Sequence, residues 1–73
     1  MNENEKVIIN EYEKVKIEIR AQLFAAMADL PESVEFYAQK TGVSRNTLIR
    51  FIEGVLPVKI STVMKIKNYL INL

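Results

Sequence analysis

Four polar side chains stand close together in the second half of the chain, and their types suit contact with DNA bases. They are Arg45, Asn46, Thr47 and Arg50, at the start of a predicted short helix. An arginine can donate two hydrogen bonds to guanine, an asparagine can pair with adenine, and a threonine methyl can contact the thymine methyl. On a lone helix Arg45 and Arg50 would be plain solvated charges. Beside Asn46 and Thr47 in the motif described next, we expect all four residues to contact base edges in a DNA major groove.

These side chains must be positioned by residues 34 to 53. The pattern of this segment predicts a helix, a sharp turn and a second helix. Gly42 can adopt a positive φ at the turn, and the small Ala38 lets the two helices cross closely. Ser33 and Ser44 are good N-caps for the two helices, and Gly54 suits the position just after the second. The buried side of this unit is predicted to consist of Val43, Leu48 and Phe51.

A long helix is predicted before this unit, over residues 5 to 29. Residues 15 to 20 alternate in polarity like a strand, but no second alternating segment is available to pair with them, so we favour helix. Pro31 ends the element. After the apolar connector at residues 55 to 58, a last helix is predicted from near Ser61. The apolar positions that recur three or four residues apart in the long helix are Ile8, Tyr12, Val15, Ile19, Leu23, Ala26 and Leu30.

Composition limits the function further. The 73 residues make one small domain of marginal stability, which dimerisation would support. The chain lacks Cys and His and has only two glycines, so we expect no catalytic residues, no metal and no cofactor. No apolar run approaches the ~20 residues of a membrane span, and the acidic N-terminus is unlike a secretory signal. We expect a cytoplasmic protein without a membrane partner.

The charges are unevenly distributed. Residues 1 to 38 carry four basic and eight acidic side chains, a net charge of −4. Residues 39 to 73 carry six basic and one acidic side chain, a net charge of +5. Chance in a short chain is one interpretation. The other is a basic half that faces phosphates and an acidic half that faces solvent or a partner.

From about Lys16 to Leu70 the chain resembles the lambda-repressor/Cro family of helix-turn-helix proteins. The positions that carry the resemblance are Ala38, Gly42, Val43, Ser44, Leu48, Phe51, Gly54 and the run from Met64 to Leu70. The resemblance implies an all-α fold, a compact bundle of four to five helices whose second and third helices contact DNA. Residues 16–73 would form this domain, and residues 1–15 would be an extension that continues the first helix.

The family also anchors DNA phosphates, which set register without carrying sequence information. By resemblance, the phosphate-contacting positions here are Ser33, Lys40, Ser44, Lys59, Ser61 and Thr62. Lys40 and Lys59 are equally open to being ordinary surface lysines. Three features depart from the family. Val34 replaces a frequent Gln, the connector after the third helix is apolar where the family is often basic, and residues 1 to 15 precede the usual first helix and continue its apolar stripe.

The candidate dimer or partner interface lies in the first helix. Ile8, Tyr12, Val15 and Ile19 keep coiled-coil spacing, so this stripe either packs along the bundle or forms a dimer seam. Residues 69 to 73 are a second candidate seam. Phe36 either packs under the N-terminal extension or belongs to an exposed patch for a partner.

Together these patterns predict a sequence-specific DNA-binding transcriptional regulator, a repressor that binds a pseudo-palindromic operator in double-stranded DNA as a homodimer. The alternative is a helix-turn-helix scaffold that binds a protein partner, as an antitoxin or a phage accessory factor would. An enzyme is the least favoured class.

Overall fold

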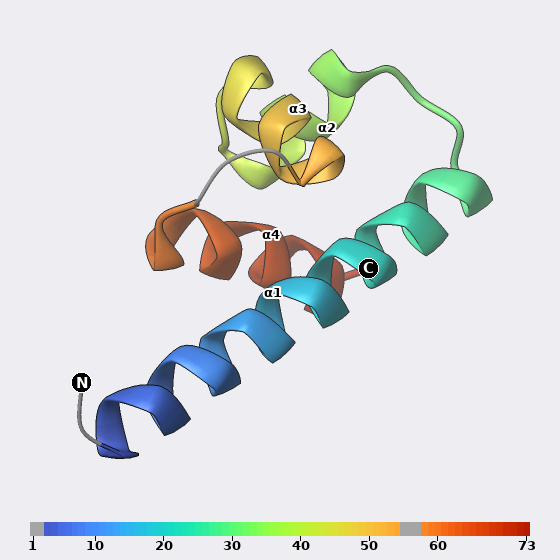
Figure 1. Ribbon diagram of the computed structural model, residues 1–73. Helices are drawn as coiled ribbons and strands as arrows, with labels where there is room; N and C mark the ends of the chain where they lie inside the picture. Colours follow the sequence, from blue (N-terminus) through green and yellow to red (C-terminus); the bar gives the residue numbers. More distant parts are fainter. Residues whose placement is uncertain (1–2, 55–57) are drawn as a thin grey trace.

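The computed structural model describes the backbone of residues 3–54 and 58–73 and, within those ranges, the side chains from residue 11 onward. That part of the chain contains four helices and no strand: α1 (Glu3–Asp29), α2 (Val34–Thr41), α3 (Arg45–Glu53) and α4 (Ile60–Ile71) (Figure 1). The all-α prediction is confirmed, with four helices in the described residues. Connector residues 55–57 and the Ile8 side chain lie outside them.

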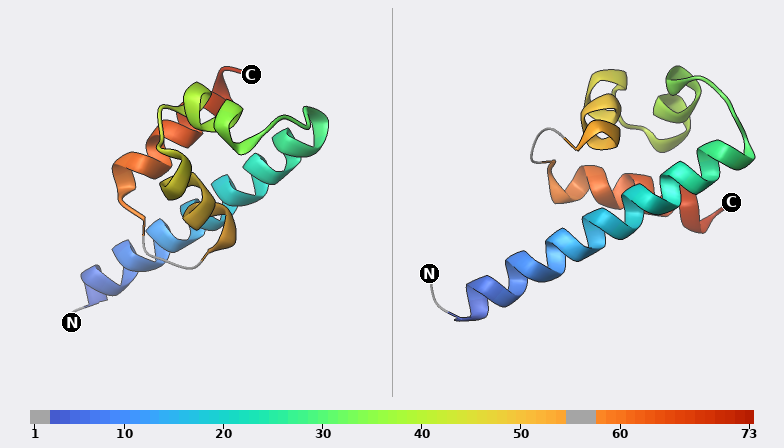
Figure 2. Two further views of the ribbon diagram at one scale, coloured as in Figure 1. Left: turned by 90° about the horizontal axis from the view of Figure 1, so that it is seen from above. Right: turned by 45° about the vertical axis from the view of Figure 1, so that its right-hand side comes forward.

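Helix α1 is continuous over 27 residues and determines the length of the molecule. At 1.5 Å per residue it spans about 40 Å, which accounts for most of the longest extent of 43 Å. The strand-like alternation at residues 15 to 20 therefore lies in the middle of a helix. The first turns of α1 project away from α2 and α3 (Figure 1, Figure 2).

Helices α2 and α3 are short, and local signals determine their ends. The Ser33 side chain accepts a hydrogen bond from the Phe36 amide (3.1 Å), and the Ser44 side chain accepts one from the Thr47 amide (3.3 Å). Gly42 and Gly54 follow the two helices with φ of 76° and 71°. The predicted caps and glycine turns are confirmed. Helix α4 begins at Ile60, one residue before the predicted start, and its N-cap, Lys59, makes no side-chain cap bond.

The core takes side chains from all four helices and from the turn between α2 and α3. Its buried apolar residues are Ile19, Leu23, Tyr37, Val43, Leu48, Phe51, Val63 and Ile66. One polar residue, Thr41, is buried with them. Its hydroxyl donates to the Tyr37 carbonyl (2.7 Å) and accepts from the Val43 amide (3.3 Å), so its burial leaves no unpaired polar group.

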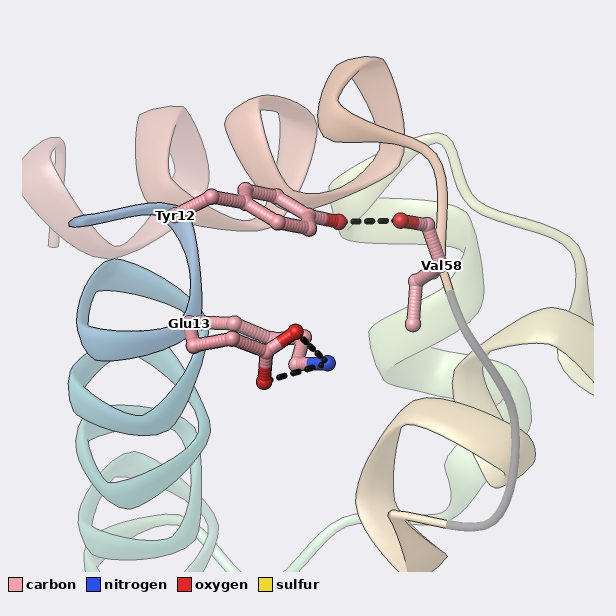
Figure 3. A network of polar contacts seen from close by, with 4 residues as sticks. Tyr12, Glu13 and Val58 are labelled. Atoms are coloured by element: carbon pink, nitrogen blue, oxygen red, sulfur yellow. Dashed lines mark hydrogen bonds and ion pairs between the residues drawn. The ribbon is translucent and has the colours of Figure 1, made fainter. Parts of the chain in front are cut away.

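Hydrogen bonds between distant residues complete the packing. The Tyr12 hydroxyl of α1 donates to the Val58 carbonyl just before α4 (Figure 3). The Tyr37 hydroxyl donates to the Leu30 carbonyl and so ties α2 to the end of α1. Both bonds cross between elements, and they hold α1 in place beneath the shorter helices. Within the described residues, none of the helices combines the length and apolar character that a membrane crossing requires.

Candidate nucleic-acid interface

Helix α3 has one buried side and one exposed polar side. Leu48 and Phe51 are buried, whereas Arg45, Asn46 and Arg50 are exposed. The helical period of 3.6 residues causes this division, because positions 48 and 51 lie one turn apart on a different face from positions 46 and 50. The predicted separation of apolar and polar side chains along α3 is therefore present in the fold.

Thr47, the fourth candidate base contact, is half-buried and belongs to the start of the helix. The Ser44 hydroxyl donates to the Thr47 hydroxyl oxygen (2.8 Å) while it accepts from the Thr47 amide. Ser44 is thus already engaged as a cap, and it orients the Thr47 side chain.

Arg45 is paired with Glu35, the second residue of α2. Arg45 Nε lies 2.5 Å from Glu35 Oε1, and the two side chains keep 55% and 62% of their accessible surface. The pKa of the Glu35 carboxyl is lowered, first by a hydrogen bond from its own backbone amide and then by the hydrogen bond from Arg45. Glu35 is therefore ionised at neutral pH, and the pair joins the first turns of α2 and α3.

This pairing orients the guanidinium without blocking it. The bond to Glu35 uses Nε, so Nη1 and Nη2, the two donors that a bidentate contact to guanine requires, are outside that bond. Both side chains are exposed, and an exposed pair of this kind contributes little to stability. The two terminal nitrogens of Arg45 can thus bond an incoming acceptor at a low cost in stability.

Arg50 lies one turn after Asn46 and is exposed. No carboxylate in the described residues forms an ion pair with Arg50. Together with Arg45, it places two guanidinium groups on the exposed side of one nine-residue helix.

Apart from Ser44, which caps α3, the candidate phosphate contacts fall into two groups. Ser33 caps α2, and Lys40 lies in the last turn of the same helix with its ammonium 5.5 Å from the centre of the Phe36 ring. Lys59 and Ser61 are exposed and Thr62 is half-buried, all at the start of α4. Helix starts attract anions, because their amides are not used within the helix. No hydrogen bond or ion pair of the described residues joins the α4 group to α3.

The candidate interface residues have unequal exposure. Val15 is exposed and Tyr12 half-buried, whereas Ile19 is only 4% exposed and packs in the core of its own chain, which leaves it little surface for a partner. Phe36 is half-buried, with its ring edge-on to Tyr37 at 5.1 Å.

The first alternative for Phe36, packing under the N-terminal extension, is wrong. Helix α2 lies near the C-terminal end of α1, far from residues 3–15 (Figure 1, Figure 2). Phe36 packs instead against Tyr37 within its own helix, at the margin of the core.

Sequence reasoning missed two residues that support α3. One is Glu35, described above. The other is Arg20 of α1, whose Nε donates to the Ile52 carbonyl at 2.7 Å while its guanidinium lies 5.1 Å from the Phe24 ring centre. A cation near the last carbonyls of a helix is favourable. The opposite charges of Glu35 and Arg45 in the first turns of adjacent helices were a usable signal, whereas nothing local indicates the Arg20 contact.

No family model, no curated protein and no solved structure matches this chain. The described residues contain no group of three or more His, Cys, Asp or Glu side chains that could hold a metal ion. The geometry of α3 and its surroundings is therefore the basis for assigning a function.

Proposed function

We propose that this chain is a sequence-specific DNA-binding protein in which α2 and α3 form a helix-turn-helix. Helix α3 enters the major groove and Arg45, Asn46, Thr47 and Arg50 contact base edges. The observation that carries the proposal is the exposed polar side of α3, with two guanidinium groups and an amide on a helix whose other side is anchored by Leu48 and Phe51.

The charge distribution supports the same function. Residues 39 to 73 hold six basic side chains and a single carboxylate, Glu53. Although Arg45 is also paired with Glu35 of α2, the half that contains α3 keeps an excess of positive charge that attracts phosphates. The short helix is also well fixed at both ends, by the Ser44 cap and by Gly54. Side chains on a rigid element keep the geometry that base recognition needs.

The proposed biological role is transcriptional regulation, as a repressor. A homodimer would bind a pseudo-palindromic operator whose half-sites lie about one helical turn, ~34 Å, apart. Occupancy of the site would exclude polymerase. Phosphate contacts from Ser33, Lys40, Ser44, Lys59, Ser61 and Thr62 would set the register of α3.

Selection of bound sequences from a random DNA pool at low salt tests the proposal. The wild-type chain should enrich a defined motif with two related half-sites. Arg45→Ala with Arg50→Ala should lose the motif and bind the enriched DNA roughly 10- to 100-fold more weakly or worse, because each bidentate contact discriminates by about 1–3 kcal/mol.

The matched control removes the same charge elsewhere. Lys14→Ala with Lys65→Ala changes two exposed cations on α1 and α4 and should keep the motif. Circular dichroism should show unchanged helix content for both double variants. If the wild-type chain enriches no motif, or both double variants bind alike, the proposal fails.

A protein-interaction scaffold is the second candidate, favoured by the exposed apolar side chains of α1. Ile17 and Phe24 lie seven residues apart there, with 63% and 44% of their surface exposed. Phe36 is less suited to this role, since it packs against Tyr37 beneath the Lys40 ammonium. Under this alternative, Phe24→Ser should abolish binding of the protein partner. The double variant Arg45→Ala with Arg50→Ala should keep that binding.

A further inference from the structure

A groove of about 310 Å³ runs between α1 and α4, and no residue of α3 lines it. Its two walls belong to different helices, which the core holds side by side (Figure 1). The residues that line it are Glu11, Tyr12 and Val15 from α1 and Ile60, Val63, Met64 and Lys67 from α4.

The groove is mainly apolar and its apolar walls are exposed. Val15, Ile60 and Met64 expose 37%, 64% and 41% of their surface. Val63 is fully buried and Tyr12 half-buried, so they form the floor. Burial of such a surface against a partner is favourable. A domain of 73 residues buries a smaller fraction of its surface than a large domain does, so its stability is marginal. Additional burial in a dimer interface therefore adds a larger share of its total stability.

The charges of the groove have opposite signs on its two walls. Glu11 stands on the α1 side and Lys67 on the α4 side. In a two-fold dimer, residue i of one copy meets residue j of the other, and j meets i. When the two-fold axis runs parallel to the groove, the α1 wall of each copy lies opposite the α4 wall of the other, so that each Glu11 faces the side of the other copy that carries Lys67. The surface is self-complementary in charge as well as apolar.

We propose that a second copy of this chain docks in this groove and forms a two-fold dimer through α1 and α4. The inference rests on the proposed function for its purpose, because a two-fold operator requires two copies of α3. Its physical basis, the exposed apolar walls and the paired charges, is independent of DNA. Tyr12 and Val15 belong to the interface predicted from sequence. The α4 wall was not predicted.

Charge reversal tests the arrangement. In sedimentation experiments without DNA, Glu11→Lys and Lys67→Glu should each weaken the dimer by about 10-fold or more, because like charges then face each other across the interface. An equimolar mixture of the two variants should dimerise again. In the mixed dimer the lysine introduced at position 11 faces the glutamate introduced at position 67.

Two further variants separate the interface from general effects. Met64→Lys changes an exposed residue, so the fold should persist by circular dichroism while the dimer is lost. Glu18→Lys changes an exposed carboxylate of α1 that does not line the groove and should leave the dimer intact.

Three results would overturn the inference. A wild-type chain that stays monomeric would show that the groove does not bind a second copy and that any protein it binds is a different one. A Met64→Lys variant that still dimerises places the interface elsewhere. Recovery in the double variant, Glu11→Lys with Lys67→Glu, but not in the mixture, places the charge pair within one chain.

Failure of the interface and failure of the proposed function give different results. The variant Arg45→Ala with Arg50→Ala should still dimerise, because neither residue lines the groove. A chain that dimerises through the groove but retains no DNA defeats the DNA-binding proposal alone. A chain that binds its DNA motif as a monomer defeats the interface alone.

Discussion

Two of the four candidate base contacts are oriented by a neighbour before any DNA arrives. Glu35 holds Arg45 through Nε, and Ser44 holds the Thr47 hydroxyl. A side chain that is already oriented loses less conformational entropy on binding than a freely rotating one. The Glu35 carboxylate also limits which partner Arg45 can accept, because it repels a phosphate that approaches from its side. These two contacts support the proposal of base recognition over one of general attraction to the DNA backbone.

Titration of Glu35 tests the ion pair. The carboxyl has a pKa below the ordinary value of 4.5, so its contribution to stability is present above that value and is lost as pH falls through the folded-state pKa. Arg45→Ala should raise the pKa of Glu35 toward 4.5 without reaching it, because the hydrogen bond from the backbone amide remains. Carboxyl carbon chemical shifts measured against pH by NMR give this value. Arg50→Ala is the control and should leave it unchanged, and an unchanged value in Arg45→Ala would contradict the pair.

Among the elements, α3 depends most on its surroundings. Nine residues are too few for a stable isolated helix in water. Its start is capped by Ser44, its end by Gly54, and its last carbonyls receive Arg20 from α1. The long helix therefore supports the candidate DNA-binding surface from behind, at a residue 32 positions away along the chain.

Removal of the Arg20 guanidinium should loosen the end of α3. Arg20→Met keeps most of the apolar stem and should destabilise the fold by about 1.5–3 kcal/mol, a typical value for a hydrogen bond that involves a charged group. The measurements are the urea midpoint and amide hydrogen exchange at Phe51 to Gly54, which should become faster. Lys14→Met, an exposed change on the same helix, should alter neither. If Arg20→Met and Lys14→Met have the same urea midpoint and the same exchange rates, the Arg20 hydrogen bond does not stabilise the end of α3 in solution.

The whole molecule is held by a small core to which every helix contributes. Leu23 of α1, Leu48 of α3 and Ile66 of α4 are all fully buried. Because the same cluster anchors α3, the candidate DNA-binding surface and the global fold share one set of contacts. Loss of the core should therefore remove the α3 surface in the same transition.

Leu23→Ala tests this coupling. The substitution should cost about 2–5 kcal/mol, which is a large share of the stability expected for a small domain. Thermal unfolding followed by circular dichroism should show a sharply lowered midpoint, and the loss of DNA retention should follow the loss of helix. Ile17→Ala, at an exposed position of the same helix, should change stability by no more than about 0.5 kcal/mol. A variant that loses helix and keeps DNA retention would disprove the coupling.

The sequence alone determined the features whose causes lie within a few residues. Ser33, Ser44, Gly42 and Gly54 define the ends of α2 and α3 through contacts at most four residues apart, so their residue types predicted the outcome. The polar side of α3 followed in the same way from the helical period. The start of α4 was less certain, because Lys59 makes no side-chain cap bond that would mark it.

Only the tertiary structure decided which distant groups meet. Tyr12 reaches Val58 across 46 positions and Arg20 reaches Ile52 across 32. Phe36 packs beside Tyr37, and Tyr12 and Val15 share a groove with Met64. Residue types are compatible with many such pairings, because a hydroxyl or guanidinium can bond any carbonyl within reach. The crossing of α1 over α4 and the shared core select among them.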